Sequence, residues 1–417
     1  MSTSIYKQFG LKRVVNGRSY STKVGGCLMA PEVLQAIQEA AKCFVRIEDL
    51  QDAASRVIAA ATGAEAGMVT CGASAALTLG MAGCIAGLDV ARMNALPETR
   101  GLRNQVIIQR LHRNDYDHAL RLTGAEIVEV GFKYATFPYE LDNVINEKTA
   151  AVFFLAGHGQ RGLPLPLITE IAHKHGVPVI VDASAELPPP ENLKRFISQG
   201  ADLVAYSGGK HIQGPQSSGF LCGKRDLILS ANLQQQDMDV FPETWSYRNL
   251  IDQGILVGPP HHGLGRGFKV GKEEIIGFLT ALQLYLKRDF AAELKQWKER
   301  VQQIVRGLEG IRGLKASYVF PSETGRPVPA AHIQVDENVA GLNAHALINL
   351  LQTGDPIVSV YESQAGSGTI IVFPETLMDG EPELIVRRFK EILACNLDGS
   401  IQSETSFSEP IPSHRQL

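Results

Sequence analysis

The sequence predicts an α/β fold with a mostly parallel central sheet in a large domain, followed by a smaller C-terminal α/β domain. At 417 residues the chain exceeds what one hydrophobic core usually takes, so two domains are expected. Short β-rich runs alternate with helical segments through its middle, a pattern typical of a parallel sheet covered by helices. After Gly271 the pattern changes to helix with charged faces and then to a second α/β segment.

The large domain is expected to begin with helices. Residues 31–61 carry apolar side chains at helical spacing in two segments, and residues 68–88 indicate a strand, a tight turn and a buried helix. Helices are also expected at LPLITEIAHKHG and NLKRFISQG, and strands at NQVIIQR, AEIVEV, TAAVFFLA, VPVIVD, ADLVAYS and SGFLCG. Ligands of such open sheets collect at the carboxyl ends of the strands, so we expect the functional residues there.

The C-terminal part begins with residues 272–311, which predict one long helix with charged faces. Strands at HIQVDE, PIVSVYE and TIIVFP and a closing helix at ELIVRRFKEILACNL then predict the smaller domain. The expected divisions are an N-terminal arm (1–30), a large domain (31–270), a linking helix with the small domain (271–398) and a polar tail (399–417).

The composition excludes several classes of protein. Apolar residues make up 44% and charged residues 20%, which is ordinary globular usage. The net charge of -4 provides no broad cationic field, so nucleic acid is an unlikely partner. The six cysteines form no CxxC pair and are expected to be reduced. No apolar run is long enough for a signal peptide or a membrane span, so we expect a cytoplasmic protein without a membrane partner.

Lys210 lies just beyond an expected strand, among glycines and hydroxyls, in ADLVAYSGGKHIQGPQSSGFLCGK. A lysine that forms an imine must be near neutral, and a partly buried site among uncharged groups lowers its pKa in that direction. The alternative is a solvated loop lysine, which is the common case for a single lysine.

Asp182 ends the buried strand in VPVIVDASAELPP. A carboxylate there can pair with the protonated pyridine nitrogen of pyridoxal 5'-phosphate (PLP), whereas the alternative is a helix-cap or turn aspartate. About one helix and one strand separate Asp182 from Lys210. We therefore expect both at the same edge of adjacent or near-adjacent strands.

The segment CGASAAL places small residues at the start of a helix. The backbone N–H groups of Gly72, Ala73 and Ser74, with the Ser74 hydroxyl, could cradle a phosphate at the positive helix end. Ser207 is a further candidate phosphate donor. The segment matches neither GxGxxG nor the P-loop, and a simple packing turn is the alternative.

A strand is expected to end near His112, in VIIQRLHRNDYDHAL. His112 could stack its ring on the face of a pyridine, and the alternative is a polar loop with a helix cap at Asp115 or Asp117. The surrounding histidines lack metal-ligand spacing and an acidic cluster, so no metal site is expected.

Together, five segments resemble the selenocysteine-synthase-like branch of fold-type I PLP-dependent enzymes, which includes L-seryl-tRNA(Sec) selenium transferase and D-glucosaminate-6-phosphate ammonia-lyase. They are VVNGRSYSTKVGG, TGAEAGMVTCGASAALTL, VDASAELPPPENL, ADLVAYSGGKHIQGPQSSGFLCGK and GRGFKVGKEEIIGFLTAL. The resemblance spans nearly the whole chain and implies PLP as the cofactor. It implies Lys210 as the Schiff-base lysine, Asp182 as the pyridine partner, and Ser74 with Ser207 near the phosphate.

The resemblance also implies residues that contact the substrate. Arg266 and Lys269 are expected near the active site, where cations suit an anionic substrate. Asn16 and Thr22 are expected near a site shared between subunits, so a homodimer or higher homo-oligomer is predicted. His261 and His262 are either acid/base candidates in a Gly/Pro-rich loop or an exposed pair.

Two departures from the family pattern bear on the function. The segment DPIVSVYES carries Tyr361 and no nearby cation, which puts the carboxylate clamp of aminotransferases in doubt. The family motifs begin near residue 10, which leaves no room for the tRNA-binding domain of the bacterial selenium transferase. We therefore expect a PLP-dependent lyase that eliminates ammonia from a small, anionic amino acid or amino sugar acid. A racemase or an aminotransferase is the alternative, and a tRNA-dependent selenium transferase fits less well.

Overall fold

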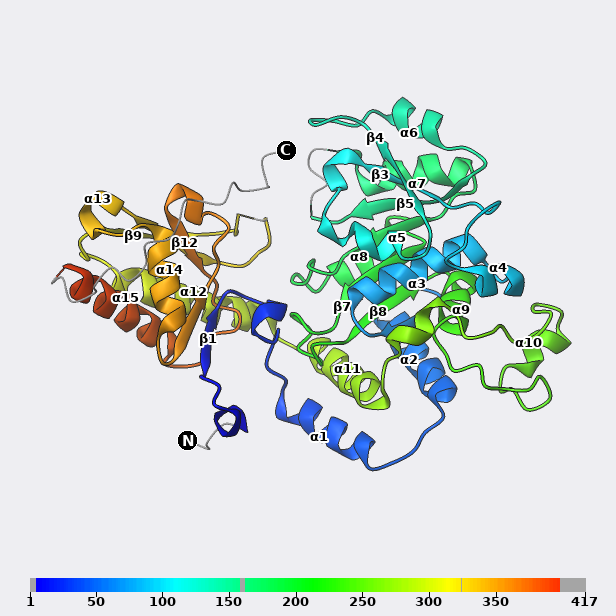
Figure 1. Ribbon diagram of the computed structural model, residues 1–417, viewed down its shortest axis with the longest axis horizontal. Helices are drawn as coiled ribbons and strands as arrows, with labels where there is room; N and C mark the ends of the chain where they lie inside the picture. The colour runs from blue at the N-terminus through cyan, green and yellow to red at the C-terminus, as the bar shows by residue number, and fades with distance from the viewer. Residues whose placement is uncertain (1–4, 158–161, 324, 398–417) are drawn as a thin grey trace. The chain divides into compact units, whose positions relative to one another are not determined.

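A computed structural model describes residues 5–157, 162–323 and 325–397. Contacts divide the chain into two compact units (Figure 1). The larger unit comprises Tyr20–Phe290 together with Thr324–Pro327, and the smaller unit comprises the rest. The observed division therefore falls about twenty residues beyond the expected boundary at 270, and the N-terminal arm is shared between the two units.

A seven-stranded sheet forms the centre of the larger unit, in the order β2-β8-β7-β6-β5-β3-β4. Its strands β3 to β7 pair in parallel, whereas β8 is antiparallel to both of its neighbours. The mostly parallel sheet predicted from the sequence is confirmed. The strands are β2 (Ala66–Thr70), β3 (Gln105–Gln109), β4 (Glu126–Val130), β5 (Thr149–Leu155), β6 (Val179–Asp182), β7 (Leu203–Ser207) and β8 (Gly219–Gly223).

Helices cover both faces of this sheet, which explains why its central strands are largely apolar and buried. Val179 and Val181 of β6 belong to one hydrophobic cluster and Ile180 belongs to the other, as the alternation along a strand requires. The first cluster includes side chains of α2 (Ile47–Thr62), α7 (Leu165–Lys174), α8 (Asn192–Ser198) and α11 (Lys272–Tyr285). The second includes side chains of α3 (Ala73–Ala86), α4 (Val90–Ala95), α5 (His118–Arg121) and α9 (Arg225–Leu233).

Shorter elements complete the larger unit. Helix α1 packs on α11, as the apolar spacing of its sequence suggests. These elements are α1 (Pro31–Ala41), α6 (Pro138–Val144), α10 (Arg248–Asp252), η2 (Thr22–Val24), η3 (Arg110–His112), η4 (Asp115–Asp117) and η5 (Leu264–Phe268).

The long helix expected over 272–311 is instead two helices, α11 and α12 (Phe290–Gly307). They differ in burial: α11 buries half of its residues in the core of the larger unit, whereas α12 is amphipathic and buries only Trp297, Val301 and Ile304. A continuous helical pattern in the sequence therefore concealed the point where the chain leaves one unit for the other.

The smaller unit contains an antiparallel sheet of order β12-β10-β9 and a parallel pair, β1 with β11. The three strands and the closing helix predicted here are confirmed, while β9, which is largely exposed, was not expected. The elements are η1 (Ile5–Phe9), β1 (Val14–Gly17), β9 (Leu314–Val319), β10 (Ala330–Val335), α13 (Glu337–Ala340), α14 (Ala344–Thr353), β11 (Ile357–Val360), η6 (Ala365–Ser367), β12 (Thr369–Val372) and α15 (Glu381–Leu397). The expected tail, 399–417, lies outside the described residues.

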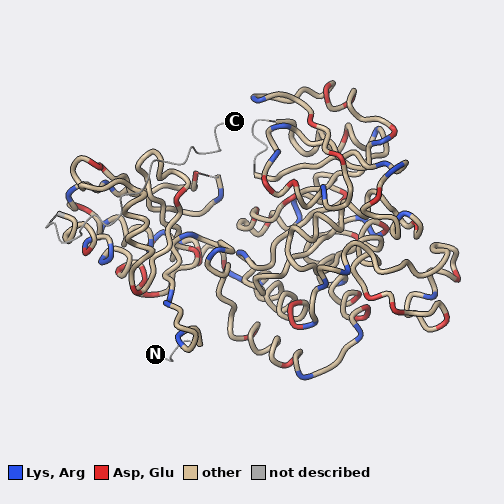
Figure 2. Tube along the Cα trace, in the orientation of Figure 1, with Lys and Arg blue, Asp and Glu red and all other residues tan. Residues whose placement is uncertain are grey.

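Charges of both signs alternate along the trace of each unit (Figure 2). Over residues 5–157, 162–323 and 325–397, no helix is both long and apolar enough to cross a membrane.

Candidate active site

The ends of two neighbouring strands place Asp182 and Lys210 at one edge of the sheet. Strands β6 and β7 pair in parallel, with Asp182 opposite Ala205, and Lys210 follows the last residue of β7 by three positions. The adjacency expected from the sequence is confirmed. Asp182 is only 6% exposed, and its Oδ1 accepts a hydrogen bond of 2.9 Å from the Ser184 N–H, which fixes the carboxylate.

Lys210 is held by a compact turn between β7 and β8, here called the lysine loop (208–218). The Gly208 N–H donates to the Ser218 carbonyl and the Gly214 N–H donates to the Gly208 carbonyl, both at 2.9 Å. A Cβ at Gly208 would lie 2.3 Å from Ser218 Oγ, and a Cβ at Gly209 would lie 2.7 Å from Gln216 Cα. The two glycines before Lys210 are therefore required by the close packing of the loop.

Side chains from other elements of the larger unit brace the lysine loop. Arg288, just after α11, donates through Nη1 to the His211 carbonyl at 2.8 Å and through Nη2 to Gln213 Oε1 at 3.1 Å. The Cys27 thiol donates to the Gly214 carbonyl at 3.3 Å. Burial raises the pKa of this thiol to about 11, so it stays protonated and keeps its donor.

Burial lowers the pKa of Lys210 below its ordinary value, although the nearby Asp182 carboxylate opposes the shift. Arg326 adds to the lowering and Glu186 opposes it. The net direction increases the fraction of neutral amine, which is the nucleophilic form that an imine-forming lysine needs.

The expected phosphate cradle lies at the start of α3. Gly72 precedes the helix with φ 101°, a conformation that favours glycine. Gly219 of β8 packs directly beneath it: a Cβ there would lie 2.5 Å from the Gly72 carbonyl carbon and 2.7 Å from the Ala73 nitrogen. Sequence reasoning did not single out Gly219, because nothing in SSGF marks its contact with a distant segment.

The two candidate phosphate hydroxyls flank this contact. Ser207, the last residue of β7, is paired with Gly219 across the sheet, and Gly219 is paired in turn with Thr70 of β2. Ser74 lies exposed in the first turn of α3. The sheet register therefore brings Ser207 to the same edge as the helix start that carries Ser74.

Arg266 and Lys269 lie on a second loop, here called the cation loop (258–270). The Cys71 thiol donates to the Phe268 carbonyl at 3.0 Å, which ties this loop to the residue before the cradle. Lys269 is exposed, whereas Arg266 Nη2 forms an ion pair of 2.8 Å with Asp237 Oδ2. The loop that carries the two predicted anion-binding cations thus contacts the residue before the cradle, and Arg266 already has a carboxylate partner.

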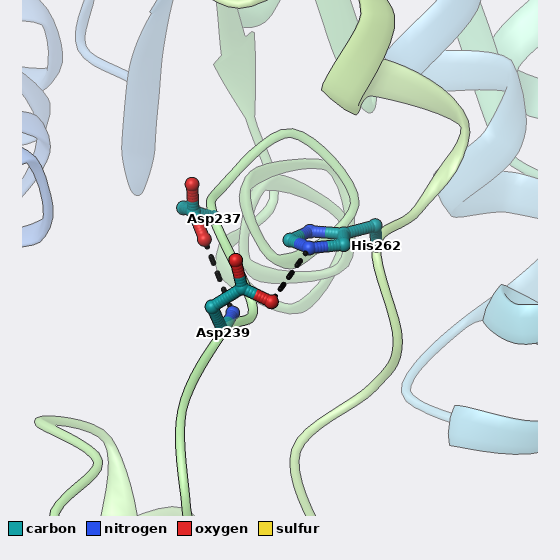
Figure 3. A group of neighbouring side chains, drawn as sticks. All are labelled: Asp237, Asp239 and His262. Carbon is teal, nitrogen blue, oxygen red and sulfur yellow. Dashed lines mark hydrogen bonds and ion pairs between the residues drawn. The ribbon is translucent and has the colours of Figure 1, made fainter.

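His262 also fastens the cation loop. Its Nδ1 accepts a hydrogen bond of 3.2 Å from the Met238 N–H. Its Nε2 faces Asp239 Oδ1 at 3.2 Å (Figure 3). Asp237, Asp239 and His262 are close enough to share a cation, but all three are exposed and Asp237 is paired with Arg266. His261 is exposed, and its backbone N–H donates to Asn94 Oδ1 at 2.8 Å.

His112 lies in η3, immediately after β3, and is fully buried. Its Nδ1 accepts a hydrogen bond of 3.3 Å from the Leu155 N–H, and its ring meets Phe154 edge-to-face at 4.9 Å. The accepting Nδ1 assigns the proton of the neutral ring to Nε2. A ring that stacks on a pyridine needs one face open to the ligand, whereas the His112 ring is fully buried.

The two N-terminal candidates fall in different units. Thr22 Oγ1 accepts a hydrogen bond of 3.0 Å from Gln216 Nε2 of the lysine loop, so Thr22 helps to brace that loop. Asn16 belongs to the smaller unit, where its side-chain amide donates to the Ser19 carbonyl at 3.0 Å and its Oδ1 accepts from the Arg18 N–H.

A carboxylate that sequence reasoning missed lines a cavity of about 450 Å³ in the larger unit. Glu186 lies four residues after Asp182, and the cavity is also lined by Arg195 and Arg326. Burial raises the pKa of Glu186 above its ordinary value. Its position in ASAELPPP was the available signal, since it follows a strand-end aspartate.

The arrangement of a half-buried lysine and a carboxylate at neighbouring strand ends occurs here on the fold of fold-type I PLP-dependent enzymes. The solved structure of a D-glucosaminate-6-phosphate ammonia-lyase matches with a TM-score of 0.80 and 31% identity, covering 94% of this chain and 99% of that one.

The family model described as L-seryl-tRNA selenium transferase matches residues 14–239, and the chain belongs to this family. D-glucosaminate-6-phosphate ammonia lyase of Salmonella typhimurium is 32% identical over 94% of this chain and 98% of that protein. A 5'-C-glycyluridine monooxygenase-decarboxylase of a Streptomyces species is 30% identical over 94% of this chain and 92% of that protein.

Proposed function

We propose that the protein binds PLP through Lys210 and releases ammonia from an anionic amino sugar acid by α,β-elimination. The observation that carries the proposal is the placement of Lys210, partly buried on its braced loop, one strand away from Asp182. Similarity over nearly the whole chain to an ammonia-lyase that acts on D-glucosaminate 6-phosphate supports the same class of substrate.

The residues of the larger unit fit this cofactor. The first turn of α3 offers backbone N–H groups at its positive end, and the absence of a Cβ at Gly219 lets this backbone approach β8 closely. Asp182 is a fixed carboxylate suited to a protonated ring nitrogen. Gly72, Ala73, Ser74 and Ser207 would hold the phosphate.

When bound, PLP supplies an electron sink for the charge left at Cα after proton removal. Lys210 would hold the cofactor covalently. Its neutral Nζ would accept the proton from the substrate Cα, and its lowered pKa increases the fraction of this neutral base. Asp182 would keep the ring nitrogen protonated.

The substrate's second anionic group would be bound by Arg266 and Lys269 of the cation loop. Arg266 would release Asp237 and bind the substrate anion instead. The Arg266–Asp237 ion pair is partly exposed, and both partners of Arg266 would be anionic groups that accept its hydrogen bonds. Asn16 and Thr22 would contribute from the N-terminal segment in a homodimer or higher oligomer.

A substrate screen tests the proposal. The protein reconstituted with PLP is mixed with D- and L-amino acids and amino sugar acids, and the ammonia, keto acid, carbon dioxide and oxygen balance are measured. Ammonia with keto acid, without a co-substrate, is the expected result. Inverted substrate alone would assign a racemase, dependence on added keto acid an aminotransferase, and oxygen uptake with carbon dioxide release a monooxygenase-decarboxylase.

A further inference from the structure

Glu186 is positioned at the sheet edge that carries Asp182 and Lys210. Leu155 of β5 is paired with Asp182 of β6, and the Ala156 N–H donates to the Asp182 carbonyl at 3.0 Å. The next residue, Gly157, leaves room for the carboxylate: a Cβ there would lie 2.6 Å from Glu186 Oε1. The Glu186 carboxyl group therefore sits directly beyond the paired ends of β5 and β6.

The backbone around Glu186 is anchored on both sides. The Asn192 side-chain amide donates to the Glu186 carbonyl at 2.7 Å, and the Glu186 N–H donates to the Ala183 carbonyl at 3.2 Å. The side chain lines the cavity that Arg195 and Arg326 also line. A carboxyl group so held faces this cavity, whose lining also includes Gly157 just beyond β5.

The charges around Glu186 come from four residues. Burial raises its pKa, the Arg326 guanidinium opposes the rise, the Asp182 carboxylate adds to it, and Arg195 and Lys210 oppose it. Asp182 and Glu186, two carboxylates near Lys210 at the same sheet edge, lie in different environments. Asp182 accepts a hydrogen bond from a backbone N–H, whereas burial raises the pKa of Glu186 and shifts it toward the protonated form.

We propose that Glu186 is the acid that protonates the hydroxyl leaving from Cβ of the substrate. The proposal rests on the lyase function proposed above and assigns a step that Lys210 and Asp182 leave unassigned. Lys210 takes the Cα proton, and hydroxide is a poor leaving group unless a proton is delivered to it.

The step balances as follows in atoms and charge. The Cα–H proton passes to Lys210 Nζ, and the electron pair left at Cα forms the Cα=Cβ bond. The Cβ–O bond breaks with its electron pair on oxygen, which receives the Glu186 proton and departs as water. Glu186 is left as a carboxylate, and hydrolysis of the resulting unsaturated amine consumes one water and yields ammonia and keto acid.

Two variants separate this role from a structural one. Glu186→Gln keeps the size and hydrogen-bonding of the side chain but carries no acidic proton, and Glu186→Asp restores the acid on a shorter arm. Glu191→Gln is the matched control, because Glu191 is an exposed carboxylate five residues further along. Folding of each variant is checked by its thermal melting temperature.

The first measurement needs no cofactor. Infrared difference spectroscopy of the apoprotein between mildly acidic and alkaline pH should show a protonated carboxyl band in the wild type and in Glu191→Gln that Glu186→Gln lacks. Because burial raises the pKa of Glu186, the band should disappear at higher pH than that of an ordinary carboxyl group. A band identical in Glu186→Gln overturns the proposal.

The second measurement separates the two proton transfers in deuterated water. Glu186→Gln should still exchange the substrate Cα proton but lose water elimination by about 10²–10⁴-fold, the range for removal of one acid. Glu186→Asp should recover part of the rate. Elimination at the wild-type rate in Glu186→Gln overturns the role of Glu186, whereas absence of Cα exchange in the wild type overturns the lyase function and this inference with it.

Discussion

The lysine loop and the cation loop lie in the same unit, but they are held by different kinds of contact. The lysine loop is closed by backbone hydrogen bonds, close glycine packing and partly buried hydrogen bonds from Arg288. The backbone of the cation loop is anchored too, by the Cys71 thiol and by the Gly265 N–H, which donates to the Gln234 carbonyl at 2.9 Å. The Arg266 and His262 side chains, in contrast, pair with Asp237 and Asp239, and all four are partly or fully exposed. The comparison teaches that the loop of the proposed cofactor lysine is fixed in place, whereas the side chains expected to bind the anion have exposed partners that they can exchange.

The largest effect is expected from Lys210→Arg on the lysine loop. Arginine keeps the positive charge but cannot provide a neutral amine, so the covalent cofactor absorption band and activity should both be lost, the latter by about 10⁴-fold or more. Absorption spectra before and after borohydride reduction measure this. Lys224→Arg is the control, since Lys224 pairs with Asp202 at 2.7 Å. A normal band in Lys210→Arg would contradict the assignment of Lys210.

The lowered pKa of Lys210 predicts how the rate of cofactor loading depends on pH. Only the neutral amine attacks the cofactor aldehyde, so the loading rate should rise with pH and level off above the pKa of Lys210. Because burial lowers this pKa, the midpoint should lie below that of free lysine. Stopped-flow absorbance of the apoprotein mixed with PLP measures the midpoint, and a midpoint at or above the free-lysine value would show that the amine is not desolvated.

Gly219→Ala should have the next largest effect, because its Cβ would collide with the backbone of the cradle. Overpacking of this kind costs about 1–3 kcal/mol, which corresponds to roughly 5- to 150-fold weaker cofactor binding. Fluorescence titration of the apoprotein with PLP measures the change in Kd. Gly366→Ala is the matched control, since a Cβ there meets nothing within 4 Å; equal effects of both variants would remove Gly219 from the site.

Arg288→Met removes the brace of the lysine loop while keeping a long apolar side chain. Hydrogen bonds from a charged donor contribute about 1.5–3 kcal/mol each, so the loop should open more often even where the overall fold persists. Hydrogen exchange at the Gln213 and Gly214 amides should be faster by about tenfold or more. Arg100→Met, at a side chain that is 89% exposed, should leave those amides unchanged.

The smallest effect on stability is expected on the cation loop. Arg266→Ala breaks a partly exposed ion pair, so the free energy of unfolding should fall by less than about 1 kcal/mol. The KM for an anionic substrate should nevertheless rise by roughly tenfold, more than for a neutral analogue, and the difference should shrink at high salt. Arg248→Ala, which breaks the exposed pair with Asp252, is the control. An unchanged KM would exclude Arg266 from substrate binding.

The sequence predicted the sheet and its functional edge because both depend on local patterns. Apolar runs such as VPVIVD identify buried strands, and the single helix between Asp182 and Lys210 implies neighbouring strand ends. Contacts between distant segments leave no such pattern: Gly219 under the cradle and Arg288 behind the lysine loop both depend on tertiary packing. The break between α11 and α12 was missed because the helical periodicity continues while the burial changes.

The antiparallel insertion of β8 also affects the order in which the site can assemble. Ser207, Lys210 and Gly219 belong to one hairpin, whose contacts close over a short loop at small entropic cost. The cradle at Gly72 comes from far earlier in the chain and reaches this hairpin only when β2 pairs with β8. A phosphate bound by both segments would therefore stabilise the β2–β8 pairing, which joins the strands of this sheet that lie furthest apart in the sequence. Retention of the cofactor would then report whether β2 and β8 have paired.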